Sequence, residues 1–140
     1  MKGNIMLMTG SAVVLLGAAG CESVATSPCS NADGALDNAA FVFVATPSSG
    51  QRVSSGFAVS GCSRTFESSV QWRLTGRDGS TIAAGHTTGG GVDGFGPYSF
   101  TVPFTVAERQ IGHLEVFETD ESDGEGFPPG QNIIPLVLQP

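Results

Sequence analysis

The sequence predicts an all-β protein, folded as a sandwich of about seven short strands. Apolar and polar residues alternate with a period of two in several segments, most plainly in 69–75 and 98–104. Twenty glycines and eight prolines separate these segments with turns. Because no segment shows the 3.6-residue period of a helix, we assign the folded part to the all-β class.

The first twenty residues are typical of a signal peptide. Lys2 supplies a basic start, and Ile5–Ala19 is an apolar run too short to span a membrane comfortably. Small residues occupy positions 18–20, as a signal peptidase requires. We therefore expect residues 1–20 to be removed during export.

Cys21 follows these small residues directly and is a candidate for lipidation. The segment resembles the lipobox of bacterial lipoproteins, whose cysteine becomes diacylated, although Ala18 stands where that motif usually has Leu. Acylation would anchor the chain to a membrane without a spanning helix, because each buried methylene contributes about 0.8 kcal/mol. Plain cleavage before Cys21 is the alternative. By the same resemblance, Glu22 implies sorting to the outer membrane, facing the periplasm, in a bacterium with two membranes.

Residues 21–40 are predicted to form a disordered tether, because small, polar and proline residues follow one another there without a sustained period. Cys29 lies in this tether and Cys62 in the folded part. Export favours a disulfide between them, which would stabilise the fold by roughly 3–4 kcal/mol. The alternative is that both thiols are free.

The charge balance excludes two classes of partner. The sequence has thirteen acidic and six basic residues, which gives a net charge of −7. An acidic surface argues against binding to nucleic acid and against electrostatic docking on anionic lipid.

The first three strands follow from the pattern after the tether. Phe41–Thr46 is an unbroken apolar, β-prone run, and Gly56–Ser63 is the next β-prone segment. Ser69–Thr75 has one apolar face, which carries Trp72, a residue expected in the core. This strand should end at Asp78-Gly79, because Asp-Gly readily adopts the positive φ values of a tight turn.

Four further strands are expected in the second half. Thr81–His86 is a weaker segment, and Tyr98–Phe104 shows the cleanest alternation in the chain. Pro103 lacks a main-chain donor, so this strand should lie at a sheet edge or contain a bulge. Gly112–Thr119 and Gln131–Leu138 complete the set, and the proline in the last segment again marks an edge or a bulge.

Seven such strands, with a tryptophan on the third, indicate an immunoglobulin-like β-sandwich in residues 41–140. An open barrel is the structural alternative. Several short motifs also follow one another in a distinctive order: Thr46-Pro47, Val53-Ser54-Ser55, Val59-Ser60-Gly61, Phe66-Glu67, Asp78-Gly79, Gly96-Pro97-Tyr98, Glu115-Val116-Phe117-Glu118 and Asp123-Gly124. In their order and spacing they resemble the Gmad-type bacterial immunoglobulin-like domain, a family named for its occurrence beside spore-germination modules. The resemblance implies an extracytoplasmic immunoglobulin-like module of the cell envelope.

Glu67 lies in the loop between the second and third strands. We expect its carboxylate to be structural, either capping main-chain donors or pairing with Arg64 or Arg73, because loops of this kind are often fixed by such bonds. Contact with a ligand is the alternative.

The loop Asp120–Gly130 concentrates acidic residues. Asp120, Asp123 and Glu125 could offer carboxylate oxygens to calcium or contact a carbohydrate, although their spacing does not reproduce an EF-hand loop. A solvated acidic loop is the alternative.

The sequence predicts neither an enzyme nor a cofactor, and it predicts no transition-metal site. His86 and His113 lack the spacing of a metal motif, and no Gly-x-Ser-x-Gly elbow accompanies the serines. The glycine run Gly89–Gly91 lacks the lysine of a phosphate-binding loop.

We therefore expect a non-catalytic, lipid-anchored module that binds a protein partner in the cell envelope. Binding would use an exposed sheet edge, or the end that carries the loops Gly89–Gly96 and Asp120–Gly130. The alternative is a calcium- or carbohydrate-binding envelope module that uses residues 120–126.

Overall fold

The computed structural model describes residues 29–30, 39–121 and 129–140. Within these residues the chain forms strands and one short 3₁₀ turn, η1 (Phe66–Ser68). No helix in this described part is long and apolar enough to cross a membrane. The strands are β1 (Phe41–Thr46), β2 (Arg52–Val53), β3 (Phe57–Arg64), β4 (Ser69–Thr75), β5 (Thr81–Thr88), β6 (Gly96–Val102), β7 (Gln110–Phe117) and β8 (Gln131–Leu138).

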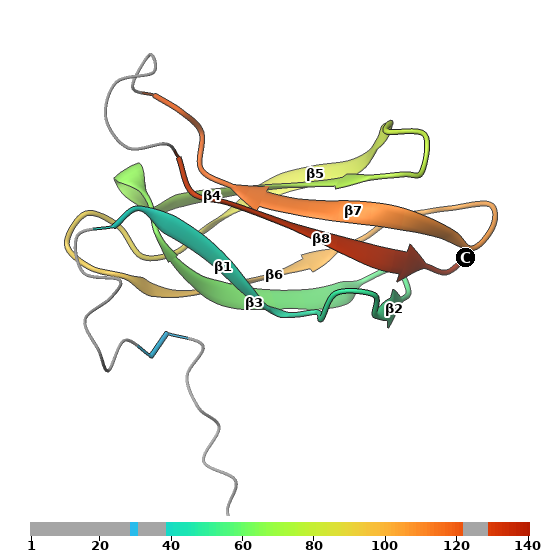
Figure 1. Ribbon diagram of the computed structural model, residues 1–140, viewed down its shortest axis with the longest axis horizontal. Helices are drawn as coiled ribbons and strands as arrows, with labels where there is room; N and C mark the ends of the chain where they lie inside the picture. The colour runs from blue at the N-terminus through green and yellow to red at the C-terminus, as the bar shows by residue number, and fades with distance from the viewer. Residues whose placement is uncertain (1–28, 31–38, 122–128) are drawn as a thin grey trace, which may run out of the picture.

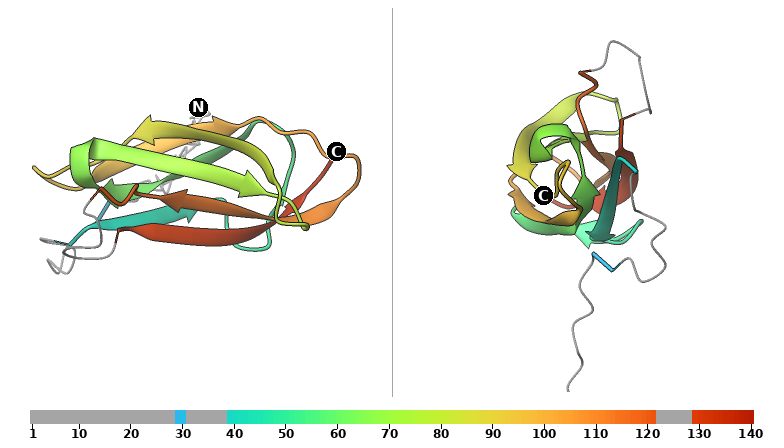
Figure 2. Two further views of the ribbon diagram at one scale, coloured as in Figure 1. Left: turned by 90° about the horizontal axis from the view of Figure 1, so that it is seen from above. Right: turned by 90° about the vertical axis from the view of Figure 1, so that its left-hand side faces the viewer.

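The described strands form two sheets packed face to face (Figure 1). Sheet A has the order β1-β3-β6, and sheet B has the order β2-β8-β7-β4-β5. All pairs are antiparallel except β2 with β8, which is parallel. The end-on view in Figure 2 shows the two sheets surrounding a common interior. The predicted all-β immunoglobulin-like sandwich is confirmed.

The chain changes sheets between β1 and β2. Beyond Thr46 it turns and runs beside β8, where the Gly50 N–H donates to the Pro135 oxygen at 2.8 Å and the Val137 N–H donates to the Gln51 oxygen at 2.9 Å. β2 was not predicted from the sequence, because a two-residue strand has no period and depends on a partner far along the chain.

The core lies where the inner faces of the two sheets meet. Trp72 belongs to it with 7 % exposure, and its indole stacks on Phe100 of the opposite sheet, with ring centroids 5.1 Å apart and planes inclined by 7°. Gly85, directly opposite Trp72 on β5, leaves the space that the indole occupies, since a Cβ there would lie 2.6 Å from the ring. The remaining buried apolar residues are Val42, Val44, Val53, Val59, Val70, Leu74, Tyr98, Val102, Phe104, Val106, Leu114, Val116, Ile134, Leu136 and Leu138.

Three of the seven predicted strands have the bounds that the structure gives, and the other four differ by one or two residues at one or both ends. β1, β4 and β8 have the expected residues, whereas β6 begins and ends two residues earlier than predicted. Pro103 therefore follows β6, which is an edge strand of sheet A. The edge or bulge predicted for the last strand is wrong, because β8 lies between β2 and β7 and its register with β7 is continuous at Pro135. Pro135 is tolerated there because its oxygen accepts from Gly50, so its main-chain groups face away from β7 and no bond to β7 is lost. The Asp78-Gly79 turn also forms, with φ +79° at Gly79.

Candidate binding surfaces

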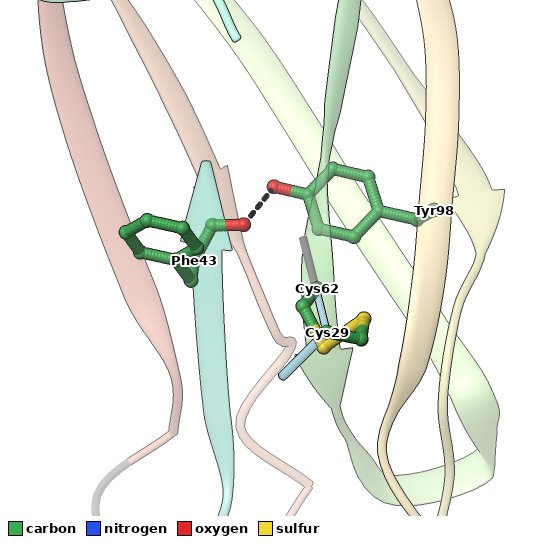
Figure 3. Close-up of a disulfide and its surroundings, with 4 residues drawn as sticks. All are labelled: Cys29, Phe43, Cys62 and Tyr98. Carbon is green, nitrogen blue, oxygen red and sulfur yellow. Dashed lines mark hydrogen bonds between the residues drawn. A yellow bond between two sulfur atoms is a disulfide. The ribbon is translucent and has the colours of Figure 1, made fainter. Parts of the chain in front are cut away.

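A disulfide joins Cys29 to Cys62 on β3 (Figure 3). Inward-facing residues of β3 alternate with outward-facing ones, and Cys62 falls on the outer face of sheet A, where it is nevertheless only 1 % exposed. Residues 29–30 thus lie on the side of sheet A that faces away from sheet B (Figure 1). Of the two states that the sequence leaves open, the structure has the bridged one.

A hydrogen bond links the two outer strands of sheet A, β1 and β6, across β3. The Tyr98 hydroxyl on β6 donates to the Phe43 oxygen on β1 at 2.8 Å (Figure 3). The ring passes over Gly61, where a Cβ would lie 1.9 Å from the Phe43 oxygen. Burial raises the pKa of the Tyr98 phenol well above its ordinary value.

The outer face of sheet B carries a polar network whose members contact one another. Arg73 forms an ion pair with Glu115, and its guanidinium lies 5.8 Å from the centre of the Phe117 ring. Gln131 donates to the same Glu115 carboxylate at 2.6 Å. These groups satisfy each other, so this face does not present an unpaired charge from the network to a partner.

One end of the sandwich exposes two apolar side chains, Phe66 at 58 % and Val92 at 61 %. Glu118 links η1 to the start of β8: its carboxylate accepts hydrogen bonds from the Phe66 N–H and, at 3.3 Å, from the Gly130 N–H. A pocket of about 290 Å³ lies beside Phe66 and is lined by Ala40, Phe66, Glu118, Thr119, Asp120, Glu121 and Pro129.

The expectation for Glu67 is wrong. Its side chain is exposed, and within the described residues it accepts no hydrogen bond. Arg64 instead donates to the Val92 oxygen at 3.1 Å, and Arg73 pairs with Glu115. Glu67 has φ +57°, in the left-handed region that residues other than glycine rarely adopt. The structural carboxylate is Glu118, which no local sequence signal identifies.

Two other candidate sites fall largely outside the described residues. Cys21, Asp123 and Glu125 lie there, so their surroundings are not part of the described structure. Asp120 is described and is exposed at the start of the acidic loop.

The histidines are not brought together. His86 on β5 and His113 on β7 are exposed and lie on opposite sides of β4, opposite Gln71 and Thr75 respectively. Among the described residues, no group of three or more His, Cys, Asp or Glu side chains is placed to hold a metal ion.

Comparison with protein families places this fold. A family model described as the immunoglobulin-like domain of bacterial spore germination, Gmad2, matches residues 41–125, from β1 into the acidic loop. Neither the curated proteins nor the solved structures gave a match. The match covers more than half of the chain and agrees with the sandwich described above, so the protein belongs to the Gmad2 family of bacterial immunoglobulin-like domains.

Proposed function

We propose that the protein is a non-catalytic module of the bacterial cell envelope, held to a membrane by a lipid on Cys21, which binds a protein partner. In a two-membraned host the anchor would be the outer membrane, with the domain facing the periplasm. Membership of an immunoglobulin-like family supports a binding role rather than catalysis.

The observation that carries this proposal is the disulfide between Cys29 and Cys62. Disulfides persist in exported proteins and are rare in the reducing cytosol, so the bond supports an envelope location. Cys29 lies eight residues after Cys21, and its disulfide is on the outer face of sheet A, the side away from sheet B.

The lipid anchor is tested by the variant Cys21→Ser in the source bacterium. We expect the wild-type protein to stay in the membrane pellet through high-salt and alkaline washes, and the variant to be released. Cys29→Ser is the matched control, because it removes a tether cysteine but keeps the acylation site. Equal membrane retention of Cys21→Ser and wild type would refute the anchor, and mass spectrometry of the mature N-terminus would then identify plain cleavage.

Partner binding is tested separately by crosslinking in intact cells. Wild-type protein should give discrete crosslinked species of higher mass, which a control carrying an unrelated domain on the same tether should not give. Identical patterns from the two would show that the domain acts as a spacer instead.

The calcium alternative makes its own prediction. A ligand that binds only the folded state raises the melting temperature, by an amount that corresponds to about 2.7 kcal/mol at a hundredfold excess over Kd. We expect millimolar calcium and chelator to give the same melting temperature. A rise with calcium that chelator reverses, and that Asp120→Asn abolishes, would favour the acidic loop as a calcium site.

A further inference from the structure

The main-chain groups at the outer edges of a sheet are the natural binding site for an extended segment of another protein, because they are not paired within the sheet. Among the described strands, β1 and β6 are the edges of sheet A, and β2 and β5 are the edges of sheet B. Their hydrogen bonds and register show which of these edges is open.

The edge of β1 lies against the first part of β8, which β2 does not cover. The Val44 N–H, which points away from β3, donates to the Asn132 side chain on β8 at 2.9 Å. Gly130 lies so close to the start of β1 that a Cβ there would be 2.8 Å from the Val42 nitrogen. Farther along β8, residues 50–53 occupy the outer edge through the bonds from Gly50 and to Gln51.

The β6 edge is interrupted by proline. The Ser99 oxygen accepts from the Thr87 hydroxyl at 3.2 Å, so the main-chain groups of Ser99 point away from β3. Alternation along the strand directs those of Pro97 and Thr101 the same way. Pro97 has no N–H, and Pro103 follows directly after the strand. Only two N–H groups of β6 therefore point outward.

The β5 edge differs from the others. The Gly89 N–H donates to the Ser68 oxygen at 2.9 Å, which makes Gly89 and Ser68 a hydrogen-bonded pair. From there the register alternates, so Thr87 and Gly85 bond to β4, while the main-chain N–H and C=O groups of Ala84, His86 and Thr88 point outward. Within the described residues, these outward main-chain groups form no hydrogen bond with another strand or loop.

Apart from a register shift near Thr81, opposite Leu74 and Thr75, β5 carries little that would protect this edge. Strands that must stay unpaired usually carry proline or a charged residue such as lysine, and Thr81–Thr88 has neither proline nor Lys, Arg, Asp or Glu. On the outer face of sheet B, the side chains of β5 are small or of moderate size: Ala84, His86 and Thr88. A strand laid beside it would therefore meet no steric or charged obstacle on the outer face.

We infer that the outer edge of β5 is the partner-binding site, and that it takes an extended segment of an envelope protein as an added strand of sheet B. This inference rests on the proposed function. The Thr87 hydroxyl reaches Ser99 on the inner side, so the two sheets come close there. The added strand should accordingly carry small side chains toward sheet A and polar ones toward solvent. The anchor would leave this edge accessible, because Cys29 is attached to the opposite sheet.

The inference is tested with proline substitutions that remove one outward N–H each. His86→Pro removes a donor on the β5 edge, and Thr101→Pro is the matched control on the β6 edge. Neither N–H is paired within its sheet, so both variants should keep the melting temperature within a few degrees. The probe is the detergent-solubilised envelope of the source bacterium, passed over each purified variant and analysed by quantitative mass spectrometry.

We expect wild type and Thr101→Pro to retain the same protein, and His86→Pro to retain at least tenfold less of it. Equal retention by all three would overturn the β5 assignment while the proposed function stands. Loss with Thr101→Pro alone would move the site to β6. No specific retention by wild type would overturn the proposed function and the inference with it.

A measurement without substitutions guards against a proline variant that fails to fold. In the free protein, the amides of Ala84, His86 and Thr88 should exchange with solvent at least a hundredfold faster than those of Gly85 and Thr87. Addition of the retained partner should slow exchange at the three outward amides. Unchanged exchange there in the complex would contradict the added strand.

Discussion

The Tyr98 hydroxyl and the Phe43 main-chain oxygen are 2.8 Å apart, although the two residues belong to strands on opposite sides of β3. This bond ties the edges of sheet A to each other from inside the sandwich, and it depends on Gly61, which leaves room for the phenol ring. A conservative substitution can remove this hydrogen bond alone, so its contribution to the unfolding free energy can be measured.

Replacing Tyr98 by Phe should destabilise the protein by about 1 kcal/mol, because the hydrogen bond is lost while the ring stays in place. Urea unfolding followed by Trp72 fluorescence measures the change. Ser99→Ala is the control, since that side chain is exposed on the same strand, and it should change stability by less than about 0.5 kcal/mol. Equal effects of the two substitutions would argue against a role for the bond.

The same phenol should make the protein sensitive to alkali. Burial raises the pKa of Tyr98 in the folded state, so the unfolded chain loses this proton first. The contribution of the neutral phenol is complete below about pH 10 and is lost as the pH rises above that value, by at most about 1.4 kcal/mol per pH unit. Tyr98→Phe should abolish this part of the decline. Because Tyr98 is the single tyrosine, tyrosinate absorbance should appear only together with unfolding.

The disulfide should be a major source of stability. Reduction, or the double substitution of Cys29 and Cys62 by Ser, should lower the unfolding free energy by roughly 3–4 kcal/mol, on the model in which the crosslink restricts the unfolded chain. Denaturation with and without reductant measures the loss. Cys21→Ser should leave it unchanged, and a small effect of reduction would mean that the tether contributes little to the fold.

Gly85→Val should disturb the core. Its side chain would meet the Trp72 indole, which cannot withdraw because Phe100 stacks on its other face, and we expect a cost of about 1–3 kcal/mol. Ala84→Val is the matched control on the same strand, where the side chain faces solvent. The fluorescence of the single tryptophan should change with the first variant and not with the second.

Glu118 and Glu67 should behave oppositely. Glu118→Ala removes the acceptor for two main-chain donors that hold η1 to the start of β8, which should cost about 1–3 kcal/mol. Glu67→Ala should change stability by less than about 0.5 kcal/mol. Thermal melts of the two variants decide the matter, and a larger effect of Glu67→Ala would restore the assignment made from the sequence.

The sequence was sufficient for the class of fold and for most strands, because alternation reports directly which face of a strand is buried. β4 illustrates this: its pattern predicts both the bounds and the burial of Trp72. β2 was not predictable, since its identity as a strand comes from pairing with β8 and not from its own two residues.

The candidate sites were predicted less well, for a related reason. Which of two nearby carboxylates holds a loop depends on where main-chain donors lie in space, and Phe66 and Glu118 are 52 positions apart. The open edge of β5 likewise depends on which of its residues form hydrogen-bonded pairs with β4, and this is set by the register of the two strands. In the sequence this strand was simply the weakest of the seven.

The crosslink between the tether and β3 has a geometric consequence for a membrane-held protein. A fully extended chain spans at most about 3.5 Å per residue, so the twenty residues between an acylated Cys21 and β1 would allow a stand-off of about 70 Å. With Cys29 joined to β3, only eight residues would separate the proposed lipid from the disulfide, and the point of attachment on sheet A would lie within about 28 Å of the bilayer. Oxidation of the two thiols would thereby shorten the maximum distance between the proposed lipid and the domain, and it would restrict binding partners to those near the lipid surface.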